Sequence, residues 1–159
     1  MAQKRNKRSK AEPTPMILYH YTSWYHMMEI IASGHITRAP SNLLKPKNPF
    51  IDSGTLVDPE TDEYKPVIWL TDSESPERLG IDGPPPEYSK KRVRFSIPMQ
   101  PHFTKWDKWA KRNKMDTDWK RCLTSGMNWK SWYISEKEIP LENVSQIFDL
   151  ENNTIIRWK

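Results

Sequence analysis

Histidine and hydroxyl residues follow two short apolar segments of this chain. In "LYHYTS", His20 and Thr22 follow Leu18 at every second position. In "IWLTDS", Thr71 follows Leu70. Imidazole and hydroxyl groups can hold sugar hydroxyls, and strand ends that direct such groups into a shared cleft commonly build a ligand site. Two interpretations are open: a nucleotide-binding cleft, or end-of-strand caps beside a core histidine.

A helix is expected to follow the first of these segments. Apolar residues recur at helical spacing after Ser23, which is a favoured N-cap, and Gly34 supplies a left-handed stop. The pattern predicts a strand at Met16–Tyr21 and an amphipathic helix at Ser23–Ser33.

The rest of the chain predicts several more short elements. Strands are expected at Val67–Thr71, in "KKRVRFSIP" and in "KSWYIS", with a final hairpin in "SQIFDLENNTIIRWK" that turns at Asn152-Asn153. Two short helices are expected within Thr104–Thr124, with Cys122 in the core. Residues 38–66, rich in proline and acidic residues, predict a long loop. This order indicates an α+β fold of short, mostly antiparallel strands with a few short helices.

Composition limits the class of protein. The chain has 159 residues, one cysteine and no apolar run long enough to span a membrane. We expect residues 1–15 to form a disordered basic tail and residues 16–159 to form one domain in a reducing, cytoplasmic compartment. The four histidines lack ligand spacing, so no metal site is expected.

Residues 104–132 combine aromatic and basic side chains. They contain five tryptophans and eight lysines or arginines against three acidic residues. Such a segment can hold single-stranded nucleic acid by base stacking beside a cationic groove, and the basic tail could assist. Alternatively, Trp106, Trp109 and Trp119 form the apolar faces of short helices while the lysines reach into water.

The order of four motifs resembles the ADP-ribosyltransferase-like superfamily. "LYHYTS", a helix closed by "SGHI", then "IWLT" and finally "WYISEKEIPLENVSQI" run in that order over about residues 16–150. The RNA 2′-phosphotransferases and the DNA-targeting ADP-ribosyltransferase toxins are the most similar branches. The resemblance implies a split sheet around a cleft that binds NAD as substrate, and transfer of ADP-ribose to an acceptor, which is a glycosyl transfer.

The resemblance also implies roles for individual residues. His20 would bind a ribose hydroxyl of NAD, with Thr22 beside it. Trp69 and Thr71 would flank the nicotinamide ribose, and Tyr21 or Trp69 would contact the nicotinamide ring.

Arginines of the "KKRVRF" strand are candidates for a phosphate contact. Arg92 or Arg94 could pair with a phosphate of NAD through the planar guanidinium. A solvated strand face is the alternative.

The expected catalytic carboxylate matches the family less well. Trp132 occupies the position of the glutamate in the toxins, and the nearby pair Glu136 and Glu138 is the substitute. Charged residues in such a loop are otherwise simply solvated. Because RNA 2′-phosphotransferases use basic residues and no such glutamate, three hypotheses stay open. They are an NAD-dependent transferase acting on an acceptor such as nucleic acid, an RNA 2′-phosphotransferase-like enzyme, and a non-catalytic nucleic-acid or protein-binding module.

Overall fold

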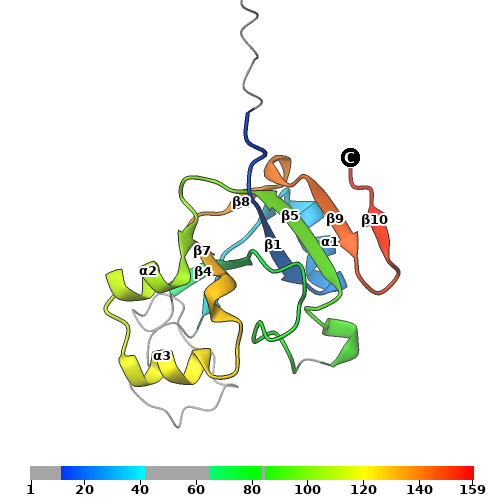
Figure 1. Cartoon of the computed structure of the whole chain (residues 1–159). Helices are drawn as coiled ribbons and strands as arrows, with labels where there is room; N and C mark the ends of the chain where they lie inside the picture. Colours follow the sequence, from blue (N-terminus) through cyan, green and yellow to red (C-terminus); the bar gives the residue numbers. More distant parts are fainter. Residues whose placement is uncertain (1–11, 42–64, 84) are drawn as a thin grey trace, which may run out of the picture.

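The computed structural model describes residues 12–41, 65–83 and 85–159 (Figure 1). Its largest element is an antiparallel sheet. The strand order of this sheet is β10-β9-β5-β1-β4-β7-β6, and β3 pairs with the first three residues of β4. The strands are β1 (Ile17–Thr22), β3 (Ala39–Ser41), β4 (Lys65–Thr71), β5 (Val93–Pro98), β6 (Thr104–Lys105), β7 (Trp132–Ser135), β9 (Gln146–Asp149) and β10 (Thr154–Ile156). A second small sheet pairs β2 (His35–Ile36) with β8 (Ile139–Pro140).

The described residues contain three α-helices: α1 (Trp24–Ser33), α2 (Trp106–Arg112) and α3 (Thr117–Thr124). Every strand pair in this part of the chain is antiparallel, so the predicted α+β class is confirmed. None of these helices has the length or apolar composition needed to cross a bilayer.

Local chemistry explains how α1 begins and ends. The Ser23 hydroxyl accepts a hydrogen bond from the backbone N–H of His26, which otherwise has no intrahelical partner. Gly34 ends the helix in the left-handed conformation at φ 77°, and its N–H donates to the carbonyl of Ile30. The predicted helix is confirmed, and it directly follows β1.

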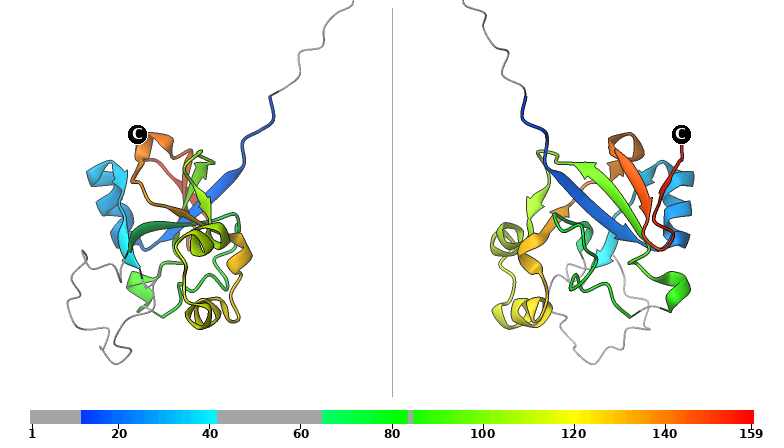
Figure 2. Two further views of the ribbon diagram at one scale, coloured as in Figure 1. Left: turned by 90° about the vertical axis from the view of Figure 1, so that its left-hand side faces the viewer. Right: turned by 45° about the vertical axis from the view of Figure 1, so that its right-hand side comes forward.

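The two faces of the sheet have different covers. One face, together with α1 and the small sheet, forms the larger core, which includes Leu18, Phe95 and Ile68. The other face of β4 and β7 packs against α2 through a cluster that includes Trp106 and Trp132. α1 lies behind the sheet in Figure 1, whereas α2 and α3 lie at its β7 end; Figure 2 shows the same layers from two other sides.

The sheet is joined at its centre by very little backbone pairing. β1 pairs with β5 over six residue pairs, from Ile17–Pro98 to Thr22–Val93. It pairs with β4 only at Tyr19–Thr71. The structure therefore has two half-sheets, which we call the β5 half (β10-β9-β5-β1) and the β7 half (β4-β7-β6, with β3). They separate beyond that single pair.

Several predicted elements are confirmed and one prediction of burial is wrong. The structure contains the strands predicted in "IWLT", "RVRFSIP" and "WYIS". It also contains both short helices and the final hairpin. Cys122 is exposed, not in the core, because α3 buries none of its residues. Trp106 and Trp109 are fully buried, which confirms that they form the apolar face of α2. Residues 1–11 of the predicted tail and residues 42–64 of the predicted loop lie outside the described residues.

Candidate functional site

His20 lies where the two half-sheets separate. It is the first residue of β1 after the Tyr19–Thr71 pair, and its Nδ1 lies 2.9 Å from the backbone oxygen of Trp69 on β4. A carbonyl oxygen can only accept, so Nδ1 carries the proton and donates it. In the neutral ring Nε2 is then an acceptor, and it has no hydrogen-bond partner among the described residues. The ring thus links both halves and presents one free acceptor.

The surroundings of His20 keep the ring neutral. Burial lowers the pKa of His20 below its usual value of 6.5. The hydrogen bond to Trp69 opposes this shift, while the positive charges of Lys90 and His26 add to it. At neutral pH His20 is therefore an acceptor at Nε2, as binding a sugar hydroxyl requires.

The structure does not bring the two predicted threonines together. Alternate residues of a strand point to opposite faces, so Thr22 shares the face of His20 and Tyr21 does not. Residues directly paired across strands share a face, and the Tyr19–Thr71 pair therefore puts Thr71 on the side of Tyr21.

Thr71 forms a local cap. Its hydroxyl donates to Ser131 Oγ at 2.8 Å and accepts from the backbone N–H of Ser73 at 3.0 Å. The hydroxyl of Tyr21 donates to the carbonyl of Ser73 at 3.0 Å on this same side of the sheet. Both residues thereby fix the segment that follows β4.

Trp69 reaches His20 only through its backbone. Its ring lies on the opposite face, with centroids 5.6 Å from Trp106 and 5.3 Å from Trp132. Trp132 is only 6% exposed, so a buried indole stands where the toxin glutamate was expected. This half of the sheet is filled by aromatic packing.

The two candidate arginines make structural contacts. Arg94 lies over the rings of Tyr19 and Phe148, at 4.8 and 5.4 Å from their centroids, and donates to the carbonyl of Glu74. This leaves the Arg94 side chain on the Tyr21 face, away from the His20 ring.

Arg92 is held at the start of β5 by three groups. Its guanidinium lies 4.5 Å from the ring centroid of Trp24, and its Nε lies 2.9 Å from Glu151 Oε2. Asp149 lies 3.8 Å away. A phosphate would have to compete with these two carboxylates.

Neither glutamate of the E-x-E pair has a contact with His20 in the described part of the chain. Glu136 accepts from Trp109 Nε1 at 3.0 Å and from Arg112 at 3.5 Å, and so ties the end of β7 to α2. Glu138 is exposed on the turn between β7 and β8.

Sequence reasoning missed an aromatic pair between α1 and a 3-10 helix. Tyr25 of α1 and Tyr88 of the 3-10 helix at Pro86–Tyr88 are 56% and 48% exposed, with ring centroids 6.2 Å apart. Tyr25 also contacts the His26 ring, whose charge lowers the pKa of His20. Half-exposed rings suit the stacking of a planar ligand ring. The available signal was Tyr25 on the solvent side of the predicted helix.

A pocket of about 490 Å³ lies beside the same 3-10 helix. Its charged lining residues are Asp82, Lys91, Arg92 and Glu151. Lys91 is paired with Glu77 and Asp82, so its charge is already balanced. His20 does not line this pocket.

No known protein family, curated protein or solved structure matches this chain.

Proposed function

We propose that this protein transfers ADP-ribose from NAD to an acceptor, on an ADP-ribosyltransferase-like split sheet. The observation that supports it is the position of His20 at the separation of the half-sheets, with Nδ1 held by the Trp69 carbonyl and Nε2 free to accept. A histidine satisfied within a core would have both ring nitrogens engaged or sealed among apolar groups, whereas His20 is partly exposed.

In this proposal His20, Thr22, the Tyr25–Tyr88 pair and Lys90 each have a role in binding NAD. Nε2 of His20 accepts a hydrogen bond from a ribose hydroxyl, and Thr22 lies on the same face of β1. The half-exposed rings of Tyr25 and Tyr88 stack a planar ring of the ligand, and Lys90 attracts its phosphates. Cleavage of the nicotinamide–ribose bond passes through an oxocarbenium-like state, which a nearby negative group stabilises.

The carboxylate is the reason for a second candidate function. Trp132 is buried at the expected glutamate position, Glu136 is engaged with Trp109, and Glu138 is exposed. A site without a carboxylate favours an RNA 2′-phosphotransferase-like enzyme, in which basic residues such as Lys90 act on a phosphate, or a binding module without catalysis.

Calorimetry with NAD tests the first proposal. We expect the wild type to bind NAD and His20→Ala to bind at least about tenfold more weakly, since a ligand hydroxyl loses its acceptor. His35→Ala is the matched control, because His35 is an exposed histidine in β2. Circular dichroism checks that each variant is folded. Absence of wild-type binding at millimolar NAD would contradict the proposal.

A pair of activity assays separates the two enzymes. Transfer of label from NAD to an acceptor, lost in Glu136→Gln or Glu138→Gln, supports the transferase. Removal of an internal 2′-phosphate from RNA, unaffected by either substitution, supports the phosphotransferase.

A further inference from the structure

Three exposed lysines lie on α2 and just beyond its C-terminal end: Lys108, Lys111 and Lys114. Lys108 and Lys111 are three apart on the helix and are therefore neighbours on its surface. Lys114 follows the C-cap Asn113 in the left-handed conformation, at φ 52°. The opposite side of α2 carries Trp106 and Trp109, which are fully buried. We call these three lysines the α2 lysine ridge.

The carboxylates around this ridge are already engaged. Asp107 pairs with Lys120 at 2.5 Å, and Asp118 pairs with Arg121 at 3.4 Å. The Asp116 carboxylate accepts from the backbone N–H at the start of α3.

Glu136, at the end of β7, likewise pairs with Arg112 at 3.5 Å. The ridge lysines have no ion-pair partner among the described residues. Lys111 acts on Asp107 without forming an ion pair, and Asp107 is already paired with Lys120, so the described part of this surface carries a surplus of positive charge.

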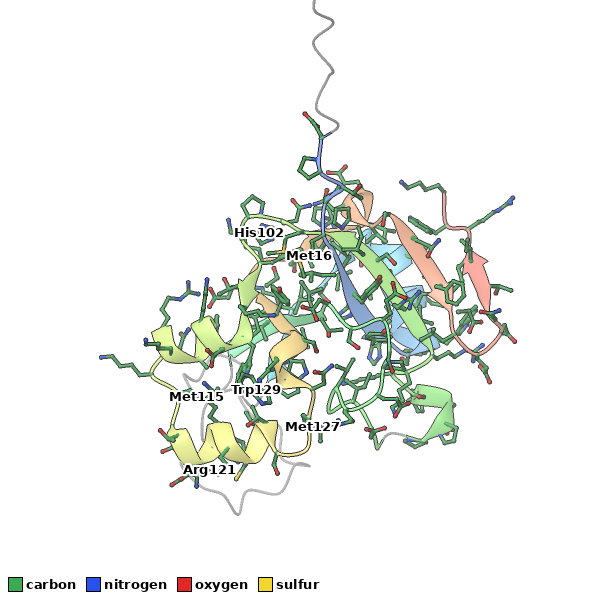
Figure 3. All side chains as sticks on the ribbon, in the orientation of Figure 1. Met16, His102, Met115, Arg121, Met127 and Trp129 are labelled. Atoms are coloured by element: carbon green, nitrogen blue, oxygen red, sulfur yellow. The ribbon has the colours of Figure 1, made fainter. Side chains whose placement is uncertain are left out.

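A tryptophan of the same basic segment lies close to two other lysines. Figure 3 shows Trp129 in the region between α2 and α3, together with Met115. The ammonium groups of Lys120 and Lys130 lie 5.9 and 5.8 Å from its ring centroid. Trp129 is only partly buried, unlike Trp106. A partly accessible aromatic ring among cations is what stacking of an unpaired base beside a phosphate backbone requires.

We propose that the α2 lysine ridge and Trp129 bind single-stranded nucleic acid. The lysines contact successive phosphates, and Trp129 stacks a base that a duplex would keep paired. This inference rests on the proposed function only for the further statement that the bound strand is the acceptor of ADP-ribose. Binding itself does not depend on NAD.

Fluorescence anisotropy with labelled oligonucleotides of equal length tests the inference. The probes are oligo-dT, oligo-U and a duplex, each titrated at several salt concentrations. The test variant combines Lys108→Ala, Lys111→Ala and Lys114→Ala, and the control variant removes three exposed charges elsewhere by Lys137→Ala, Arg157→Ala and Lys159→Ala. Alanine suits the exposed helix positions of Lys108 and Lys111, and at Lys114, with φ 52°, it replaces one residue that carries a Cβ by another, so the fold of the test variant is retained.

We expect the ridge variant to bind single strands at least about tenfold more weakly at low salt. The slope of log K against log salt should become shallower by about 2, since each single-strand phosphate contact contributes about 0.7. The control variant should retain most of the affinity. Trp129→Phe, which keeps a ring, should bind better than Trp129→Leu.

Three results would overturn the inference: equal losses in the ridge and control variants, tighter binding of the duplex, or binding to anionic phospholipid vesicles in place of oligonucleotides. Either preference between oligo-dT and oligo-U supports a single-strand site. Calorimetry with NAD on the ridge variant separates the two proposals. Lost strand binding with no NAD binding in any variant retains this site and contradicts the proposed function. NAD binding without any strand binding does the reverse.

Discussion

At the scale of single residues, the charge state of His20 links the site to folding. The folded protein lowers the pKa of His20 mainly by burial, while the unfolded chain has the usual value of 6.5. Between these two values the unfolded state binds a proton that the folded state does not. The free energy of unfolding should therefore be undiminished above about pH 6.5 and fall as the pH drops below that value toward the folded pKa.

Urea denaturation at pH 7.5 and pH 5 measures this effect. We expect the midpoint to fall less on acidification in His20→Gln than in the wild type. His102, whose pKa burial also lowers, contributes equally to both proteins and cancels in the comparison. An unchanged pH dependence in His20→Gln would show that His20 titrates alike in the two states.

Glu136 makes a structural contact, so substituting it changes the stability of the protein as well as any catalysis. Its carboxylate satisfies the indole N–H of the fully buried Trp109. Glu136→Ala should lower the free energy of unfolding by about 1–3 kcal/mol, because a buried donor loses its partner. Glu136→Gln keeps an acceptor oxygen and should cost less. Thermal or urea denaturation checks this order, and equal losses would show that the hydrogen bond contributes little.

At the scale of elements, Gly34 sets the end of α1 and the start of the small sheet. Its φ is 77°, and an added Cβ would meet no atom within 4 Å. The Gly34 carbonyl also accepts from the N–H of Leu141. Gly34→Ala should therefore destabilise the protein by about 1–2 kcal/mol through backbone strain alone. Gly34→Asn should cost less, since asparagine tolerates the left-handed region; denaturant unfolding of the two variants tests this.

The sequence predicts elements best where local chemistry determines them. Ser23 and Gly34 mark the ends of α1, and the apolar spacing between them leaves little choice. The hairpin is also predicted, but its turn is longer than the two residues Asn152-Asn153. The connection spans residues 150–153, and the Asp149 carboxylate accepts from the backbone N–H groups of Glu151 and Asn152. The two-residue strands β2, β6 and β8 are too short to show any period. Cys122 follows a helical spacing, but α3 has no large core against which to bury it.

At the scale of the whole molecule, the candidate site depends on register, which no local pattern contains. Thr22 and Thr71 both end apolar strands, so the sequence alone predicts that they share one cleft. Pairing of Tyr19 with Thr71 puts their side chains on opposite faces, because a shift of one residue exchanges the faces of a strand. His20 was identified by its type and position. Its link to the Trp69 carbonyl and the contact between Tyr25 and Tyr88 required the fold.

The separation of the half-sheets makes a prediction about the whole molecule. Beyond the Tyr19–Thr71 pair, the hydrogen bond from His20 to Trp69 connects β1 with β4. A ligand that binds His20 should stabilise the ring that connects the two half-sheets, so NAD should slow amide hydrogen exchange in β1 and β4 together. An oligonucleotide should slow exchange in α2 and α3 alone. His20→Ala should abolish the first response and keep the second. Slowing by NAD in only one half-sheet would place its site away from the separation, and the ribose contact of His20 would then be wrong.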